Sequence, residues 1–398
     1  MRRVVLTGAG TVNALAGDVP GTLAALAAGR SAIGPLAFRD VERLAIRIGA
    51  QVRPWPPESG FSARDLTLAD RFSQFALIAA QEALTMAGPG LGPETGVVIG
   101  SAAGGIATWE DSYRAVFEEG RQRVPPLTVP RLMLNAPASL ISMRHGLRGP
   151  SFAVSSACAA SNHAIGLAFR MIRDGAVPAM LAGGAEAMLC FGGVKAWEGL
   201  RVLSPDGCRP FDARRNGMVM GEGAAVFVLE EAEHAAARGA VALAEIAGFG
   251  MTADAGDIVV PNGEGAAAAM RQALAEARLS PADIGYINAH GTGTGVNDRV
   301  EVAAIKQVFG PAAQRVLVSS TKAAHGHAIG ATGAIELLAC LMALREGLVA
   351  PTLGLTAPDA ECDLDHVPNE TRRAPVGAAL SNAFAFGGLN AVLALRAV

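Results

Sequence analysis

The chain has 398 residues and a formal net charge of −3, with 33 lysine and arginine residues against 36 aspartate and glutamate residues. Hydrophobic residues make up 51% of it and charged residues only 17%, compared with about 25% charged residues in average globular proteins. This composition excludes a disordered chain, a coiled coil and collagen. Because there is no basic run, the sequence gives no electrostatic basis for binding nucleic acid.

The first predicted element is a short apolar strand over residues 3–6. Glycines at positions 8, 10 and 17 interrupt the apolar run, so we expect a glycine-rich turn after this strand rather than a signal peptide. Helices come next, among them one over residues 75–86. The longest uncharged stretch, residues 374–395, contains proline, glycine and asparagine. It predicts a strand, a loop and a second strand of a buried sheet, and no membrane span.

The chain contains an internal repeat. Residues 154–166 (VSSACAASNHAIG) and residues 318–330 (VSSTKAAHGHAIG) are identical at nine of thirteen positions, at an offset of 164. A second match, between residues 221–229 and residues 387–395, follows at an offset of 166. Self-similarity at a nearly constant offset indicates two copies of one structural unit. We therefore predict that the chain is a duplicated α/β unit.

The repeat also predicts where the halves divide. Residues 7–11 agree loosely with residues 290–294, so both copies are expected to open with a strand and a glycine-rich turn. The charged stretch over residues 230–240 is interpreted as a solvated helix at the seam. We predict an N-terminal half over residues 1–238 and a C-terminal half over residues 239–398.

The repeated helix, residues 158–173 in the first copy, is apolar on nearly every side and should lie between layers. Continuous apolar strands that alternate with helices predict a sheet covered on both faces. We expect two stacked sheets with the duplicated helices between them. The strands that open and close the two copies are predicted at residues 3–6, 177–181 and 224–229, and at residues 284–289, 377–380 and 391–395.

Cys158 is the candidate nucleophile, because it follows an apolar strand and begins the repeated helix. A helix N-terminus favours a thiolate and lowers its pKa, whereas a structural cysteine is simply a small hydrophobic residue. We assign that second role to the other four cysteines. Five cysteines without a C-x-x-C pair predict neither a disulfide framework nor a zinc site, and fit a reducing cytosol. The other four are Cys190, Cys208, Cys340 and Cys362.

Two histidines lie in glycine-rich loops of the second copy, His290 in residues 288–294 and His327 after Gly326. Two neutral imidazoles can stabilise a developing enolate oxygen or transfer a proton, although a histidine of this kind can also be structural. His163, which matches His327 in the repeat, is interpreted as structural, and the role of His325 stays open.

Lys322 occupies the position in the second copy that Cys158 occupies in the first. A cation at a helix N-terminus is unfavourable, so a carboxylate should offset it, and Glu336 is the nearest along the chain. Several nucleotide-binding and hydrolase motifs are missing. The glycines at 8 and 10 lack the third glycine of a dinucleotide loop, and P-loop, G-x-S-x-G and H-E-x-x-H motifs are absent.

Four motifs in order resemble those of the β-ketoacyl-acyl carrier protein synthases of the thiolase-like superfamily. They are Ser156-Ala-Cys158, residues 288–294 (NAHGTGT), residues 320–327 (STKAAHGH) and residues 382–388 (NAFAFGG). The resemblance covers nearly the whole chain and is closest to the elongating, type II-like enzymes. It implies a five-layer α-β-α-β-α fold, a homodimer in the cytoplasm and no metal or redox cofactor.

The resemblance also implies roles. Cys158 would accept the acyl group, His290 and His327 would promote decarboxylation of a malonyl unit and stabilise the enolate, and Lys322 with Glu336 would hold the histidine region in register. The product would be a β-ketoacyl chain two carbons longer, bound to acyl carrier protein.

Further roles follow from the same motifs. The backbone N–H groups of Cys158 and Phe386 would form the oxyanion hole, with Phe386 as a gate beside the thiol. Thr292 and Thr294 would hold the phosphopantetheine arm, and Arg201 would face the acidic carrier protein.

The chain departs from the elongating synthases at positions that affect substrate choice. Ala103 stands where an aliphatic residue is common and Trp197 where a Phe is common in the acyl tunnel, so chain length stays open. Residues 254–261 (DAGDIVVP) replace a usually polar stretch near the pantetheine channel. Three features resemble nodulation-type synthases, which make unusual polyunsaturated acyl chains: His325, residues 195–198 (KAWE) and residues 359–363 (DAECD).

Two alternatives stay open. A thiolase that uses coenzyme A shares the fold, but usually has a second catalytic cysteine near the C-terminus, and no cysteine follows Cys362. A chain-length factor, the non-catalytic partner subunit of a ketosynthase heterodimer, lacks the active cysteine, so Cys158 argues against it. Neither the pathway nor the choice between homodimer and heterodimer follows from the sequence.

Overall fold

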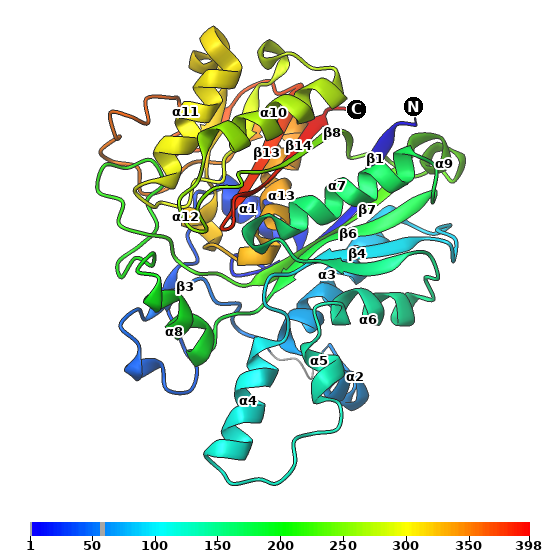
Figure 1. Cartoon of the computed structure of the whole chain (residues 1–398). Helices are drawn as coiled ribbons and strands as arrows, with labels where there is room; N and C mark the ends of the chain where they lie inside the picture. Colours follow the sequence, from blue (N-terminus) through cyan, green and yellow to red (C-terminus); the bar gives the residue numbers. More distant parts are fainter. Residues whose placement is uncertain (1, 56–59) are drawn as a thin grey trace.

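The computed structural model describes residues 2–55 and 60–398 (Figure 1). The strands of its main sheet are β1 (Val4–Asn13), β4 (Gly96–Gly100), β5 (Ser151–Val154), β6 (Ala179–Glu186), β7 (Gly223–Glu231), β8 (Ala244–Ala253), β9 (Tyr286–Asn288), β10 (Leu317–Ser319), β13 (Ala378–Ala385) and β14 (Leu389–Arg396). Two small ribbons pair β2 (Gly34–Pro35) with β3 (Ile48–Gly49), and β11 (Leu348–Val349) with β12 (Arg372–Arg373).

The helices connect and cover these strands. They are α1 (Val19–Ala27), α2 (Ala63–Leu68), α3 (Arg71–Ala87), α4 (Ile106–Phe117), α5 (Thr128–Leu132), α6 (Ala136–His145), α7 (Ala160–Arg173), α8 (Phe191–Gly199), α9 (Ala232–Ala237), α10 (Gly263–Ala277), α11 (Asn297–Phe309), α12 (Lys322–His325) and α13 (Thr332–Glu346). Two short 3₁₀ turns matter for the site, η3 (Ala157–Ala159) and η6 (Ile329–Ala331). No helix among the described residues combines the length and apolar character needed to cross a bilayer.

The strand order is the same in both halves. It runs β5-β4-β6-β7-β1 in the first half and β10-β9-β13-β14-β8 in the second. In each half the three outer strands are parallel and the two inner strands are antiparallel to their neighbours. The halves join where Val4–Leu6 of β1 pair with Ala244–Ile246 of β8.

Five layers follow from this arrangement. Helices α7 and α13 lie between the two halves of the sheet, α3 and α6 cover the outer face of the first half, and α10 and α11 cover that of the second (Figure 1). Every residue of α13 from Thr332 to Leu344 is buried. The predicted thiolase-like α-β-α-β-α fold is therefore confirmed, and so is the burial of the repeated helix.

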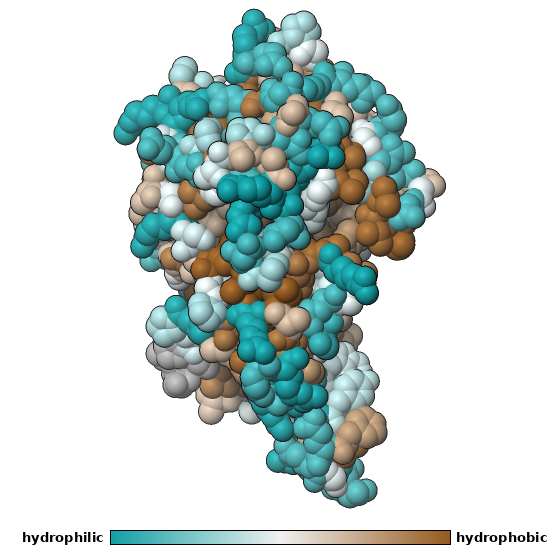
Figure 2. Space-filling model, turned by 90° about the vertical axis from the view of Figure 1, so that its left-hand side faces the viewer, coloured by the Kyte–Doolittle hydropathy of each residue, from teal (hydrophilic) through white to brown (hydrophobic). Residues whose placement is uncertain are grey.

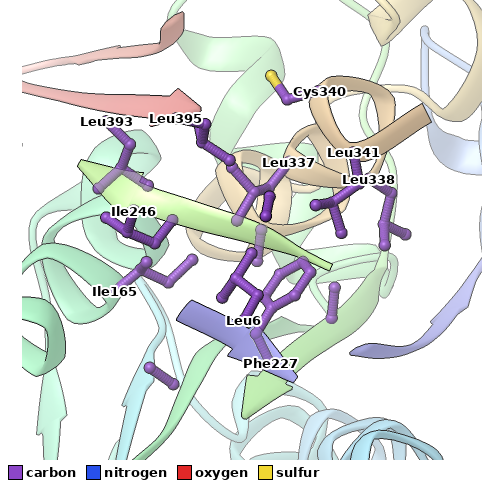
Figure 3. Packing of buried hydrophobic residues seen from close by; sticks show 14 of the residues in the cluster. Leu6, Ile165, Phe227, Ile246, Leu337, Leu338, Cys340, Leu341, Leu393 and Leu395 are labelled. Atoms are coloured by element: carbon purple, nitrogen blue, oxygen red, sulfur yellow. The ribbon is translucent and has the colours of Figure 1, made fainter. Parts of the chain in front are cut away.

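The largest hydrophobic cluster fills the space around these central helices. Figure 3 shows side chains of both halves meeting there, with Leu6 and Phe227 from the first half, Ile246 and Leu395 from the second, and Leu337 from α13. All five side chains are fully buried. Because a helix between two sheets has no solvated face, the low charge content of the chain has a direct structural cause.

The predicted turn after residue 6 is wrong, because β1 continues to Asn13. A Cβ atom placed on Gly10 would lie 2.0 Å from the carbonyl oxygen of Ala79 in α3, and one on Gly250 in β8 would lie 1.9 Å from that of Ala269 in α10. These strand glycines let a helix backbone pack directly on the sheet. The second half therefore opens with β8, and not with residues 284–289, whose strand β9 corresponds to β4.

The repeat is also aligned differently from the sequence prediction. Ala157 (φ 48°) begins η3 and Ile329 (φ 43°) begins η6, and each turn leads directly into its central helix, α7 or α13. The counterpart of Cys158 is therefore Gly330, and the predicted equivalence of Cys158 with Lys322 is wrong. His163 and His327 are not equivalent either, because α12 adds a turn before the second elbow.

A short helix, α9, does occupy the predicted seam. However, Glu230 in the same charged stretch is fully buried and not solvated. Its carboxylate is paired with Arg238 and accepts hydrogen bonds from Thr7 and His234, the last at 2.8 Å. These partners stabilise the charge that burial would otherwise penalise.

Candidate active site

Three reactive side chains from different segments meet between the two halves. Cys158 lies on η3, His290 follows β9, and His327 lies between α12 and η6. One ligating atom from each of the three lies within 4.8 Å of the others, and all three residues are buried. The two imidazole rings face each other edge-on, with centroids 5.5 Å apart. A thiol and two imidazoles in contact can form a covalent intermediate and stabilise an anion.

The hydrogen bonds of His327 define its tautomer. Its Nδ1 accepts the backbone N–H of Ile329 at 3.1 Å and lies 2.8 Å from the hydroxyl oxygen of Thr332. The proton of the neutral ring is therefore on Nε2. This atom is buried and has no hydrogen-bond partner among the described residues. His327 can donate a hydrogen bond to a ligand that enters the site.

His290 is positioned by its backbone. Its N–H donates to the Glu301 carboxylate at 2.8 Å, as does the N–H of Gly291. Its carbonyl oxygen accepts a hydrogen bond from Nζ of Lys322, which is also 2.6 Å from Oε1 of Glu336. Lys322 and Glu336 are fully buried. The structure thus contains the Lys322–Glu336 pair that the sequence predicts, and the pair contacts the histidine loop.

Burial controls the protonation of the site. Burial first, and then the charge of Lys322, lower the pKa of both His290 and His327 well below the ordinary value. Both rings are therefore neutral near pH 7. The same positive charge disfavours a metal cation between the three ligating atoms.

Burial acts in the opposite direction on the thiol. It raises the pKa of Cys158 to about 12, although the Lys322 charge and two backbone N–H groups partly oppose it. The expected low pKa of Cys158 is therefore wrong. A helix N-terminus stabilises a nearby thiolate by only about 0.3–2 kcal/mol. This is less than the free energy that it costs to ionise a thiol out of contact with water.

Two backbone N–H groups point at the sulfur of Cys158, its own and that of Phe386. Phe386 lies in the loop between β13 and β14, where Gly387 (φ 84°) and Gly388 (φ 68°) adopt left-handed conformations. Its ring is stacked on Trp197 at a centroid distance of 5.8 Å. The sequence-predicted pair of N–H donors thus lies at the nucleophile, and the aromatic ring lies beside it.

A pocket of about 270 Å³ leads to these residues. Its walls include Trp197, Arg201, Thr292 and Thr294, together with Phe386 and the three reactive side chains. The hydroxyl oxygens of the two threonines are 2.9 Å apart. Ala103 does not line this pocket; it packs against the hydrophobic cluster that contains Cys158. All sequence-predicted site residues except Lys322, Glu336 and Ala103 therefore line this pocket, and Lys322, paired with Glu336, holds the His290 loop at its edge.

The two remaining histidines of interest have structural partners. Nδ1 of His325 donates to the carbonyl oxygen of Gly326 at 2.8 Å, and its Nε2 lies 2.9 Å from the hydroxyl oxygen of Thr321. His163 lies 2.8 Å from the hydroxyl oxygen of Ser156. Neither side chain lines the pocket.

Sequence reasoning missed the carboxylates that support the site. Glu186, at the end of β6, accepts the N–H groups of Ala102 at 2.7 Å and Gly330 at 3.1 Å. It thereby ties a turn of the first half to the elbow beside His327. Asp298 and Glu301 on α11 accept N–H groups of the loop that carries His290. An acidic residue at the end of an apolar strand, as at Glu186, is the signal that could have identified it.

Comparison with known proteins agrees with this geometry. The N-terminal domain of the β-ketoacyl synthase family matches residues 1–235, and the C-terminal domain of that family matches residues 243–356. The chain belongs to the β-ketoacyl synthase family. The family predicted from the four sequence motifs is thus confirmed.

Individual relatives cover the whole synthase. Nodulation protein E of Rhizobium sp. (strain N33) is 48% identical over 401 residues, which are 100% of both chains. The 3-oxoacyl-[acyl-carrier-protein] synthase 2 of Staphylococcus aureus (strain COL) is 39% identical over 99% of this chain and 98% of its own. The solved structure of the ishigamide ketosynthase/chain length factor has a TM-score of 0.96 and 34% identity, and the match covers 100% of this chain and 99% of that one.

Proposed function

We propose that this synthase catalyses the decarboxylative Claisen condensation of an acyl group on Cys158 with malonyl-acyl carrier protein. The product is a β-ketoacyl-acyl carrier protein two carbons longer. The observation that carries the proposal is the contact of one thiol with two neutral imidazoles, beside two N–H donors, at the end of one pocket. The similarity to a 3-oxoacyl-[acyl-carrier-protein] synthase supports it.

In the first half-reaction, Sγ of Cys158 attacks the carbonyl carbon of an acyl thioester. Because the thiol is neutral at pH 7, its proton must leave as the new bond forms, and an imidazole in contact with it accepts that proton. The N–H groups of Cys158 and Phe386 stabilise the oxyanion of the tetrahedral intermediate. The thiol of the carrier arm takes up a proton and leaves.

In the second half-reaction, a malonyl thioester enters the same pocket and loses CO₂. The electron pair of the broken C–C bond moves onto the thioester as an enolate. Nε2–H of His327 and a ring nitrogen of His290 lie where they can hydrogen-bond that oxygen, and Lys322 and Glu301 hold the His290 loop. The enolate needs no strong base, because decarboxylation itself supplies the carbanion.

The enolate carbon then attacks the carbonyl carbon of the acyl-Cys158 thioester. The resulting oxyanion lies at the same two N–H donors, and its collapse expels the thiolate of Cys158, which regains a proton. Thr292 and Thr294 hydrogen-bond the phosphopantetheine arm, and Arg201 contacts the carrier protein. No step draws on a metal or redox cofactor.

We propose a homodimer that joins through β5, the strand at the edge of the sheet in the first half, whose residues are exposed or half-buried. Similarity to a ketosynthase/chain length factor leaves a heterodimer as the competing assembly. The repeated strand order supports the division into residues 1–238 and 239–398. Free thiols at all five cysteines support a reducing compartment.

The pathway is proposed to be a specialised one. Identity of 48% to a nodulation protein E supports synthesis of unusual acyl chains rather than ordinary fatty acids. Trp197, stacked on Phe386, lines the pocket, whereas Ala103 packs against the hydrophobic cluster that contains Cys158.

Intact-protein mass spectrometry with carrier-bound acyl groups of increasing length tests the proposal. The wild-type chain should gain the mass of each preferred acyl group, and Cys158→Ala should gain none. Cys158→Gln should still decarboxylate malonyl-carrier protein without elongating a chain. A mass gain on Cys158→Ala, or elongation by Cys158→Gln, would contradict the assignment.

A further inference from the structure

The loop between β8 and α10 ends in an exposed aliphatic tip. Ile258, Val259 and Val260 are 74%, 39% and 56% exposed. Figure 2 shows one face of the molecule, on which hydrophilic residues predominate and hydrophobic residues gather in a band across the middle. Single exposed apolar residues are common, but a contiguous group marks an interaction site. The tip falls in residues 254–261, the stretch where the sequence departs from the polar pattern of its family.

The tip stands at the mouth of the catalytic pocket. Val259 and Val260 line that pocket together with Val296, which is 54% exposed at the start of α11. The carbonyl oxygen of Ile258 accepts the N–H of Gly387 at 2.8 Å, so the tip is attached to the loop that carries Phe386. Any macromolecule that delivers a thioester arm to Cys158 through this mouth must contact the tip.

Hydrogen bonds to the two aspartates of the loop hold these aliphatic side chains at the surface. Asp257 accepts the N–H groups of Val259 at 2.7 Å and Val260 at 2.9 Å. Asp254 accepts from the side-chain amide of Asn390 at 2.7 Å and from the backbone N–H of Asn262 at 2.9 Å. The conformation is therefore formed before any partner binds, and the apolar side chains are presented to solvent.

The mouth offers little positive charge. Arg201 is the one lysine or arginine that lines the pocket, and within residues 2–55 and 60–398 it forms no ion pair. Lys195, the nearest lysine along the chain, is paired with Glu198 at 2.8 Å. Among the residues that line the pocket, an acidic partner would thus find one cation, Arg201, beside exposed aliphatic side chains.

We infer that the acyl carrier protein of this synthase docks mainly through an apolar contact. Ile258, Val260 and Val296 pack against aliphatic side chains beside the arm-bearing residue of the carrier, and Arg201 supplies one ionic contact. The identity of the partner rests on the proposed function. Because apolar contacts are insensitive to salt and a single exposed ion pair contributes little, binding depends only weakly on ionic strength.

The test compares carrier-bound and carrier-free substrates. The variant Ile258→Ser, at a side chain that is 74% exposed and does not line the pocket, is assayed with the malonyl thioester of a purified bacterial acyl carrier protein and with malonyl-pantetheine. KM for the carrier-bound substrate should rise about tenfold, as expected for the loss of a buried aliphatic contact, and the kinetics with malonyl-pantetheine should not change. Val241→Ser is the matched control, because Val241 is 72% exposed and does not line the pocket.

Isothermal titration calorimetry, with the holo-carrier protein titrated into the synthase, measures docking separately from catalysis. The Kd of the carrier protein should rise about tenfold in Ile258→Ser and less than threefold in the wild type between 50 and 300 mM salt, as estimated for one exposed ion pair. An unchanged Kd in Ile258→Ser, or a salt effect above tenfold, overturns the inference. If the wild type binds the carrier but condenses neither thioester, the proposed function fails and the docking inference stands.

Discussion

Nζ of Lys322 lies 2.6 Å from Oε1 of Glu336, and both side chains are fully buried. The lysine also donates to the carbonyl oxygen of His290, so one cation joins α12, α13 and the histidine loop. A buried ion pair adds little net stability, but loss of one partner leaves an uncompensated charge. The pair therefore fixes the position of His290, and removal of either partner should destabilise the fold.

Replacement of that carboxylate should be severe. Glu336→Gln keeps the shape of the side chain but leaves the Lys322 charge unpaired, so the free energy of unfolding should fall by about 3–5 kcal/mol. Urea denaturation followed by circular dichroism measures the loss. The double variant Lys322→Met/Glu336→Gln should recover part of it, because neither position of the pair then holds a buried charge. A single variant as stable as the wild type would contradict the assignment.

His327 should act after acylation, because its Nε2 carries a proton and cannot accept one from the thiol of Cys158. His327→Ala removes the free Nε2–H donor, so condensation should slow about 10²–10³-fold, the effect of losing one preorganised donor. Acyl transfer to Cys158, followed by mass spectrometry, should still reach completion. Thr332→Ala is the mild control, because Nδ1 of His327 keeps the N–H of Ile329. Equal loss of acylation and condensation in His327→Ala would argue for a role in thiol activation.

Decarboxylation should be independent of pH near neutrality. Burial and the Lys322 charge hold the pKa of His290 and His327 well below the ordinary value of 6.5. As the pH falls from 8 to 6, both rings stay neutral and remain hydrogen-bond donors. The malonyl decarboxylation rate of Cys158→Gln, measured across this range, should be flat. A midpoint near pH 6.5 would contradict this prediction.

Glu186 should make stability depend on pH. Burial raises its pKa from an ordinary value of 4.5 to about 7. The unfolded chain therefore releases the proton of Glu186 at a lower pH than the folded chain does. The free energy of unfolding should fall as the pH rises from 4.5 to about 7, because over this range the folded chain holds a proton that the unfolded chain has lost. The size of this fall is on the order of 3 kcal/mol. Glu186→Gln should lack this slope between pH 5 and 8 in urea titrations; parallel curves for the two proteins would refute the assignment.

The strand glycines should tolerate no side chain. Gly10→Ala places a Cβ atom 2.0 Å from the carbonyl oxygen of Ala79, so α3 must move away from the sheet. We expect a loss of about 1–3 kcal/mol in the free energy of unfolding, the usual cost of overpacking. Gly17→Ala is the matched control, since nothing lies within 4 Å of its Cβ position. Thermal denaturation measures the stability of both variants. A loss in Gly10→Ala but not in Gly17→Ala would show that close packing requires the glycine, and an equal effect in both would contradict this explanation.

Local motifs were enough to find the reactive residues. Cys158, His290 and His327 stand in short segments whose residue types suit their chemistry, and Glu336 could be matched to Lys322 because few acids are near it in the sequence. What depends on distant contacts could not be predicted. The glycines of β1 resemble a turn until α3 is placed against them.

The acidity of the thiol is another property that depends on distant contacts. A helix start near Cys158 indicates a low pKa, yet the sulfur is enclosed by segments of both halves, and burial outweighs the helix. Likewise, the 164-residue offset hides the extra segment that contains α12. The sequence match therefore pairs Cys158 with Lys322, which lies eight residues before Gly330, the structural counterpart of Cys158.

The elbow of the second half explains why the duplicated fold has lost its symmetry. Gly330 stands where the first half has Cys158, and a Cβ atom there would lie 2.6 Å from the backbone nitrogen of Ala102 and 2.7 Å from Oε2 of Glu186. No nucleophile fits at that position. The residues that pack against this elbow belong to the first half. The first half therefore carries the nucleophile, and the elbow of the second half forms part of the wall around it.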